Sequence, residues 1–371
     1  MPDYRFPCES CGNQLTYEPG QTSLKCPYCG RVQAIPQARA EEVAEALVEN
    51  DYAQAIRDMA RDAPMEETRV VACPNCGAQT TFPEGVQAAT CPFCATPLVL
   101  ADAGTHRHVR PAALIPFQLD EPTAHKAMNA WLGSLWFAPG GLKEYARAGR
   151  RMDGVYVPFW TFDADTTTRY QGSRGDAYYV TRTVQRDGKS HQVQERRIRW
   201  RNVSGTVARF FDDVLVLASR SLPKAHTDGL EPWDLAALSP YRPDYLSGFQ
   251  AEGYAIGLEE ALTLAKARMD PVIEQDIRAD IGGDEQRISA KATDFRDVTF
   301  KHVLLPVWLA AYRYDGRSFR FVVNGQTGKV QGERPWSKWK IAGAVLLALL
   351  LAAAAVYGYQ WAEANGYLQA R

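Results

Sequence analysis

The eight cysteines of the sequence lie within its first 94 residues and form two sets with the same spacing. Each set reads Cys-x2-Cys-x14-Cys-x2-Cys, and the second set begins 65 residues after the first. The members are Cys8, Cys11, Cys26 and Cys29, followed by Cys73, Cys76, Cys91 and Cys94. Two cysteines three residues apart place both sulfurs on one side of a tight turn, and two such knuckles complete a tetrahedral shell of four thiolates. The two sets therefore predict two metal sites per chain.

The chemistry of a four-thiolate shell favours Zn²⁺, with two ions per chain, because four protein ligands leave no open coordination position. Rubredoxin-like iron is the alternative, since its knuckles have similar sequences. A closed site of this kind is structural, and it folds about 25 residues that hold too little apolar mass to fold alone. The residues after Met1 form no apolar leader. We therefore expect the thiols in a reducing compartment, bound to metal rather than paired as disulfides.

The residues around the cysteines predict zinc ribbons joined by a helical linker. In the first ribbon, residues 14–17 and 23–25 are expected to form a hairpin with its turn at Pro19-Gly20. Between the ribbons, residues 38–61 are rich in helix formers, and Asn50-Asp51 is expected to divide them into two helices.

The charge of the chain argues against a nucleic-acid partner. The 371 residues, enough for roughly two to three domains, carry a net charge of -1. The first 100 residues hold seven Lys and Arg against thirteen Asp and Glu. Because phosphate contacts require Lys and Arg, two acidic ribbons are poorly suited to bind nucleic acid. A nucleic-acid-binding protein associated with replication or transcription is kept as an alternative function.

The central region, residues 103–335, has the pattern of an α+β domain. Helices are expected at residues 123–135, 142–148 and 258–269. Strands are expected at residues 154–163, 178–185, 193–203, 206–218, 298–314, 319–323 and 329–330. Asp187-Gly188 separates two alternating runs and predicts a hairpin turn.

Two similar phrases occur in this domain, Val-Tyr-Val-Pro-Phe-Trp at residues 155–160 and Val-Leu-Leu-Pro-Val-Trp at residues 303–308. Trp160 and Trp308 are expected in the core. Two related β-rich lobes are the alternative explanation of the similarity. A proline in a strand indicates an edge or a first position.

Residues 196–201 form a basic run, Arg-Arg-Ile-Arg-Trp-Arg, on the second strand of the predicted hairpin. The period of two places Arg197, Arg199 and Arg201 on one face of that strand. This face is either simply solvated or binds an anionic partner, for which lipid headgroups, the acidic ribbons and another protein are candidates.

Asp163 and Asp165 are expected on one face of a strand. They form either a polar strand end or a site for a divalent ion. No other set of residues reaches the level of a catalytic constellation, so we expect no enzymatic activity. An enzyme that uses the β domain is kept as a further alternative.

Residues 341–362 carry no charge and are long enough, at about 33 Å, to cross a bilayer as a helix. Aromatic residues flank this run, and the cationic residues Arg334, Lys338 and Lys340 precede it. The positive-inside rule therefore predicts a single-pass protein with residues 1–340 in the cytoplasm. A buried helix of a soluble protein is the alternative.

The expected division of the chain follows from these patterns. The parts are residues 1–36 (first ribbon), 37–68 (linker), 69–102 (second ribbon), 103–335 (α+β domain) and 336–371 (transmembrane helix and short tail).

The ribbons, the phrases at residues 154–160, 304–308 and 324–329, and the terminal span resemble a bacterial family of membrane-anchored zinc-ribbon proteins. Its ribbons are of the transcription-factor-B type, and members are often labelled as relatives of the replication-restart helicase, primosomal protein N′. This chain lacks helicase motifs. Relatives are similar to the membrane partners of phage-shock and flotillin-like envelope-stress proteins. The resemblance implies a scaffold or adaptor at the cytoplasmic face of the inner membrane. It does not identify the protein partner, for which phage-shock and flotillin-like proteins are candidates.

Overall fold

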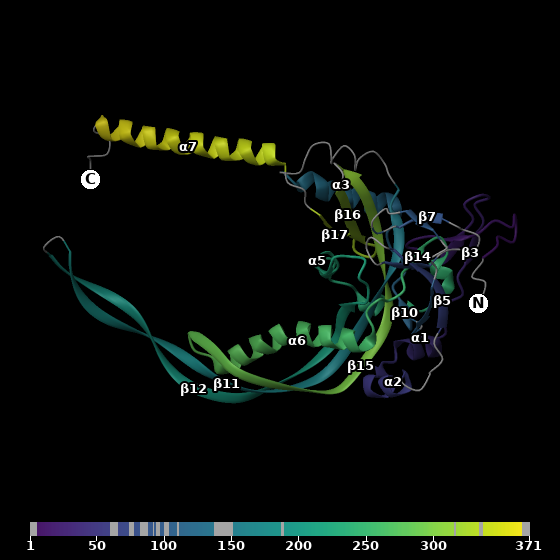
Figure 1. Cartoon of the computed structure of the whole chain (residues 1–371), viewed down its shortest axis with the longest axis horizontal. Coiled ribbons are helices and arrows are strands. Elements are labelled where there is room, and N and C mark those ends of the chain that lie inside the picture. Colours follow the sequence, from purple (N-terminus) through teal and green to yellow (C-terminus); the bar gives the residue numbers. More distant parts are fainter. Residues whose placement is uncertain are drawn as a thin grey trace.

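The computed structural model describes most of the chain. The described residues are 6–59, 66–73, 78–81, 88–91, 93, 97–99, 104–109, 111–136, 151–186, 189–314, 317–333 and 337–365. Helices and a β-rich body coexist in them, so the predicted α+β class is confirmed. Figure 1 shows a body from which two long elements extend to the same side, a curved β arm and the helix α7. The predicted helix at residues 142–148 lies outside the described residues.

The core of the body is a nine-stranded sheet with the strand order β12-β11-β15-β10-β13. Its long strands are β11 (Asp153–Arg186), β12 (Lys189–Leu217) and β15 (Glu285–Tyr314), which pair antiparallel. The short strands are β4 (Asn50–Asp51), β10 (Ala113–Leu114), β13 (Ser239–Pro240), β14 (Gln250–Ala251), β16 (Arg317–Asn324) and β17 (Val330–Gly332). The hairpin expected around residues 187–188 is confirmed by the pairing of its flanking strands, while the two turn residues lie outside the described part.

The two Pro-x-Trp phrases form neighbouring strands of this one sheet. Pro158 pairs with Leu304, and Trp160 pairs with His302. Trp160 and Trp308 are 0% and 5% exposed, so both are core aromatics as predicted.

Each proline of these phrases lies where a neighbouring strand ends. The Pro158 carbonyl accepts a hydrogen bond from Ala218, directly after β12, and the Pro306 carbonyl accepts one from Gly325, directly after β16. A residue's N–H and C=O point to the same side of a strand, so the missing proline N–H leaves no ladder bond unmade.

Helix α6 (Leu258–Ile281) covers one face of the long strands. It is twelve residues longer than the predicted helix at 258–269. The reason is that the buried stripe continues through Ile273, Ile277 and Ile281, and this packing tolerates Pro271 inside the helix. Gly282, with a φ of 63°, then ends the helix.

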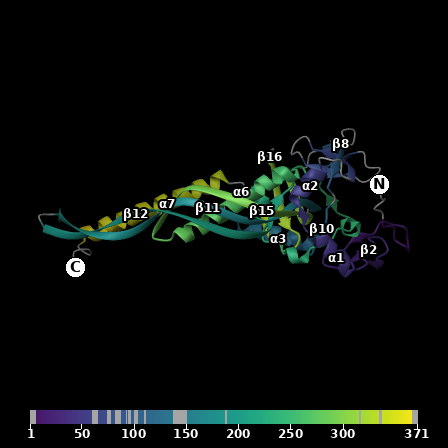
Figure 2. The ribbon, with the colours of Figure 1, turned by 90° about the horizontal axis from the view of Figure 1, so that it is seen from below.

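Beyond the body, the long strands continue as the curved arm (Figures 1 and 2). The expected strands at residues 154–163 and 178–185 are parts of the single strand β11, and those at 193–203 and 206–218 are parts of β12. The ladder between β11 and each neighbour shifts register around residue 164, where Asp213 and Asp297 adopt φ values of 50° and 48°. Aligned bulges of this kind bend and twist strands without ending them.

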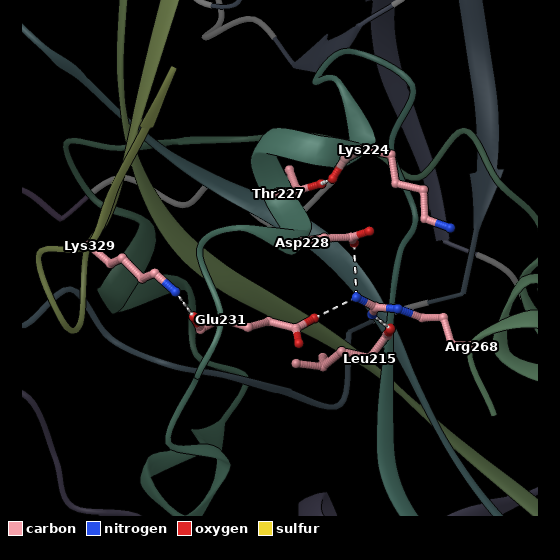
Figure 3. Close-up of polar contacts among 7 residues, drawn as sticks. All are labelled: Leu215, Lys224, Thr227, Asp228, Glu231, Arg268 and Lys329. Carbon is pink, nitrogen blue, oxygen red and sulfur yellow. Dashed lines mark hydrogen bonds and ion pairs between the residues drawn. The ribbon is translucent and has the colours of Figure 1, made fainter. Parts of the chain in front are cut away.

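The segment between β12 and α6 is fastened to the body by Arg268 (Figure 3). Its guanidinium donates to Asp228 at 2.9 Å, to Glu231 at 2.8 Å and to the carbonyl of Leu215. Lys329 donates to the carbonyl of Glu231. This segment contains α5 (Lys224–Asp228) and two 3-10 turns, η2 (Leu235–Ala237) and η3 (Pro243–Leu246). Arg268 therefore joins three segments that are distant in sequence.

The N-terminal region contains two short sheets and two helices. The first sheet consists of β1 (Thr16–Tyr17), β2 (Ser23–Lys25) and β3 (Val32–Ala34). Helices α1 (Ala40–Leu47) and α2 (Tyr52–Met59) are separated by β4, which confirms the predicted break at Asn50-Asp51. Further along lie β5 (Glu66–Ala72), β6 (Gln79–Thr81), β7 (Ala88–Thr90), β8 (Pro97–Val99), β9 (Gly104–His108) and α3 (Glu121–Ser134).

Helix α7 (Lys338–Ala364) begins at Ser337, whose hydroxyl accepts from the Lys340 N–H. The stretch Trp339–Glu363 has a mean hydropathy of 2.4 and is long and apolar enough to cross a membrane. No part of this apolar stretch is buried against the residues that the structure describes. Leucine side chains are exposed on all sides of the helix.

Candidate metal centre and buried carboxylates

The first cysteine set is brought together by two matching turns. Cys8 donates its N–H to Asn13 at 2.7 Å, and Cys26 donates its N–H to Arg31 at 2.8 Å. Gly12 and Gly30 close these turns with φ values of 73° and 76°, which L side chains rarely adopt. The antiparallel hairpin of β1 and β2 connects the two turns and brings them together, as predicted from the cysteine spacing.

The four sulfurs lie at the vertices expected for one metal ion. The Sγ–Sγ distances are 3.6 Å for Cys8–Cys29, 3.5 Å for Cys11–Cys26 and 3.5 Å for Cys11–Cys29. A tetrahedron with Zn–S bonds of about 2.3 Å has edges of about 3.8 Å. A four-cysteine metal site is therefore confirmed as possible at this place.

Backbone N–H groups favour the thiolate at two of these cysteines, whereas the neighbouring sulfurs raise the pKa of Cys11 to about 12. The N–H of Cys29 lowers the pKa of the Cys26 thiol to about 6. The N–H of Ser10 lowers the pKa of Cys8 in the same way. A lowered pKa matters because the thiolate is the metal ligand.

The second cysteine set repeats the local structure of the first. Strands β7 and β8 pair with the register of β2 and β3 shifted by 65 residues, so that Ala88–Val99 corresponds to Ser23–Ala34. Cys73 donates its N–H to Ala78 at 2.8 Å, which matches the turn at Cys8. Cys73 and Cys91 are buried, whereas Cys76 and Cys94 lie outside the described residues. The second metal site therefore stays a prediction.

The first ribbon packs directly on the body. The Tyr17 N–H donates to Ser247 at 2.8 Å, and its hydroxyl donates to the Phe117 carbonyl at 3.2 Å. The Tyr17 ring contacts Tyr245 with centroids 5.2 Å apart. Gly20 also donates to Phe117, and a Cβ there would lie 2.9 Å from the carbonyl of Gln118. The first ribbon is thus part of one hydrophobic core with the sheet.

The second ribbon meets the body beside a buried carboxylate. Gly253 donates its N–H to the Gln79 carbonyl at 3.1 Å. The adjacent Glu252 is 4% exposed and accepts from the hydroxyls of Ser219 at 2.7 Å and Ser221 at 3.0 Å. Burial raises the pKa of Glu252 to about 8. Sequence analysis did not find this group.

Asp163 and Asp165 do not form the predicted pair. Asp163 is buried, whereas Asp165, two residues further along the strand, is exposed. Instead, Asp163 lies with Glu49 and Asp213 in a cluster whose carboxylate oxygens are all within 4.8 Å of one another. The two carboxylates share one side of β11, as predicted, because Trp160, Phe162, Ala164 and Tyr170 all pack on the other side, but they do not gather at one site.

A lysine supplies the positive charge in this carboxylate cluster. Lys301 is 7% exposed, and its ammonium lies 2.9 Å from Glu49 and 3.2 Å from Asp213. Asp163 accepts a hydrogen bond of 2.7 Å from the N–H of Asp213. A buried cation already balances these carboxylates, so the cluster functions as an ion-pair network between the α1–α2 connection and the sheet.

In this cluster the pKa values of Asp163 and Glu49 are shifted in opposite directions. Burial and the neighbouring Glu49 raise the pKa of Asp163 to about 7. Despite its own partial burial, Glu49 has a pKa lowered to about 2, because it accepts from Asp163, Thr299 and Lys301. Below about pH 7 the pair therefore holds one proton, which lies on Asp163. No pattern in the sequence linked Glu49 to Lys301, which is distant from it along the chain.

The predicted anionic-partner residues Arg197, Arg199 and Arg201 are all exposed on the arm, while Ile198 and Trp200 between them are partly buried. The predicted alternation on this strand is thus confirmed. An open depression of 430 Å³ lies at the base of the arm and is lined in part by Asp165, Arg209 and Arg296. Asp276 holds Arg209 through two 2.6 Å bonds, and Thr167 accepts from Arg296 at 2.8 Å.

The chain is similar along most of its length to a known bacterial protein. The chain is 29% identical over 362 residues to the uncharacterized protein YdjG of Bacillus subtilis, covering 93% of this chain and 96% of that protein. No family model matches the chain, and no solved structure matches it significantly.

Proposed function

We propose that this protein is a non-enzymatic, membrane-anchored adaptor with two zinc ribbons, which recruits or scaffolds proteins at the cytoplasmic face of the cell inner membrane. The observation that carries the proposal is the contrast between the two ends of the chain. A four-cysteine cluster stiffens the N-terminal end, and an apolar helix exposed on all sides forms the C-terminal end. An adaptor tethered in this way raises the local concentration of its partner at the bilayer.

The charges of the first ribbon support a protein partner over a nucleic acid. Lys25 lies 3.0 Å from Glu18, and Arg31 lies 2.6 Å from Glu9. These carboxylates compensate the two cations, and they would be brought close to a phosphate backbone if the ribbon bound one. The closed four-thiolate shell has no position for a substrate. The function in envelope stress, with phage-shock or flotillin-like proteins as partners, is proposed from the family resemblance.

The anchor is tested by comparing the full chain with a variant that lacks residues 337–371. We expect the full chain in the membrane fraction and the truncated chain in the soluble fraction. A second variant, in which an unrelated single span replaces α7, should return the head to the membrane and restore partner crosslinking there. Metal analysis of each form is expected to give two Zn²⁺ per chain. A truncated chain that stays with the membrane, or turnover of a substrate by the purified head, would contradict the proposal.

A further inference from the structure

The connection between α1 and α2 meets the sheet at the edge formed by β15. Strand β4 has two residues, Asn50 and Asp51, which pair with Phe300 and Thr299 of β15. Both residues of β4 are exposed, and neither of the helices beside it contains a fully buried residue. Segments with few buried contacts open at a lower free energy than the core of a fold. The polar contacts that hold this connection to the sheet therefore decide whether it stays in place.

Four charged side chains, which come from four segments of the chain, meet directly beside β4. Glu49 belongs to the connection itself, and Asp163, Asp213 and Lys301 belong to β11, β12 and β15. The Lys301 ammonium lies 2.9 Å from Glu49 and 3.2 Å from Asp213. The hydroxyl of Thr299 donates to Glu49, and oxygens of the three carboxylates lie within 4.8 Å of one another. Glu49 is thus the residue through which this cluster holds the connection.

The proton on Asp163 limits the repulsion inside the cluster. Glu49, Asp213 and Lys301 are the charged groups that face Asp163, from the connection, from β12 and from β15. Two carboxylates share one ammonium while Asp163 is protonated, whereas three carboxylates surround the same ammonium after it ionises. Asp163 is 6% exposed, so water screens little of the added repulsion. Burial and the neighbouring Glu49 raise the pKa of Asp163 to about 7, so the third charge appears near neutral pH.

Of the four segments, the connection is the one that can leave the cluster most easily. Asp163 lies inside β11, which pairs with β12 on one side and with β15 on the other. Asp213 donates its N–H to Asp163 at 2.7 Å, and Lys301 pairs with Thr161 in the same sheet. Separation of these side chains would break ladder bonds of the core sheet, whereas departure of Glu49 breaks the two-residue pairing of β4. The Glu49 side chain is also 25% exposed, so its carboxylate already lies close to water.

We propose that the cluster is a pH-sensitive latch, which holds the α1–α2 connection on β15 while Asp163 carries a proton and releases it when Asp163 ionises. The connection joins the two ribbons along the chain, so its release gives residues 48–59 more freedom between them. This device works inside the head of the protein and does not require the membrane anchor. It therefore goes beyond the proposed function and can be tested separately from it.

The direction and the size of the response follow from proton linkage. A raised pKa in the closed state stabilises that state fully below the ordinary value of 3.8, and the stabilisation is lost as the pH rises through about 7. In the open state Asp163 is solvated, so it is ionised throughout the range from pH 6 to pH 8. The ratio of open to closed connection should therefore rise about tenfold between pH 6 and pH 8, with little change at higher pH.

The test is hydrogen–deuterium exchange of the full chain in detergent micelles, measured by mass spectrometry at pH 6, pH 7 and pH 8. Peptides that cover residues 48–59 are compared between the wild type and Asp163→Asn at each pH, because the intrinsic rate of amide exchange then cancels. Asp165→Asn is the matched control, since Asp165 is an exposed carboxylate two residues further along β11. Glu49→Gln is a second variant, which removes the neighbouring charge without a change in the long strands. Peptides of α6 and the metal content report on the rest of the fold.

We expect the exchange rate of the wild type relative to Asp163→Asn to rise about tenfold from pH 6 to pH 8 at residues 48–59 and to stay constant in α6. Asp165→Asn should behave like the wild type, and Glu49→Gln should lose the pH response. A relative rate that is constant with pH would overturn the inference. An equal response in α6 would also overturn it, because the whole fold would then loosen. If Asp163→Asn does not fold, a response of wild-type size in Glu49→Gln would have the same consequence.

Discussion

Relative to the wild type, Asp163→Asn is expected to become more stable as the pH rises, although the substitution changes a buried side chain. Asparagine keeps an oxygen that can accept from the N–H of Asp213, and its amide can donate to Glu49. The substitution therefore keeps these hydrogen bonds. It removes a carboxyl that must ionise at high pH although the folded state favours its protonated form. The folded-state pKa of Asp163 is about 7, against an ordinary value of 3.8.

The size of the effect follows from proton linkage. A raised pKa gives stability that is complete below pH 3.8 and is lost as the pH rises through about 7. From pH 5 to pH 8 the wild-type chain should therefore lose about 2.5 kcal/mol through Asp163 alone. Glu252 adds a loss in the same direction, with its pKa of about 8, but it is present in both proteins and cancels from their difference.

The measurement is urea unfolding of the full chain in detergent micelles, followed by tryptophan fluorescence at several pH values. The free energy of unfolding of Asp163→Asn minus that of the wild type should increase by about 2.5 kcal/mol between pH 5 and pH 8. Asp165→Asn is the matched control, because Asp165 is two residues away and exposed, and it should stay within about 0.5 kcal/mol of the wild type. A difference for Asp163→Asn that is flat with pH would refute the assignment of the shared proton.

Two further substitutions test the metal site and the Arg268 contact. Cys26→Ser is expected to reduce the metal content from two Zn²⁺ to one and to accelerate amide exchange at Leu119, next to the docked ribbon, without affecting β7 and β8; unchanged metal content would refute the ligand assignment. Arg268→Met leaves Asp228 and Glu231 without their cation and should lower the free energy of unfolding by about 1–3 kcal/mol, measured by urea unfolding. Arg220→Met, which removes an exposed pair with Glu260, should change it by less than about 0.5 kcal/mol, and equal effects would show that Arg268 is only a surface pair.

The local features that repeat in the sequence were predicted well, because they depend on near neighbours. The cysteine spacing predicted a hairpin that the structure contains, and the same register recurs 65 residues later. The break between α1 and α2 follows from two residues that favour turns. The alternation at Arg197 and Arg199 holds because that part of β12 has regular pairing.

The continuous strands of the arm could not be predicted because their glycines resemble turn signals. At Gly172 an added Cβ would lie 2.5 Å from the carbonyl of Arg287, and at Gly175 it would lie 2.6 Å from Ile198. These glycines therefore allow close packing inside a sheet rather than a change of direction. Similarly, Asp163 meets Glu49 and Asp213 through segments that are distant in sequence, which no local pattern reveals.

Both ribbons meet the body at the same place, the segment of β11 around Tyr156. The first ribbon docks on Phe117, whose ring lies 5.1 Å from that of Tyr156. The second docks beside Glu252, whose N–H donates to the Tyr156 carbonyl at 2.9 Å. Tyr156 is 0% exposed and belongs to the strand that continues into the arm. Metal ions in both ribbons would therefore stabilise this part of β11, and we expect the loss of both ions to loosen it before the ladder between β11 and β12 opens further out.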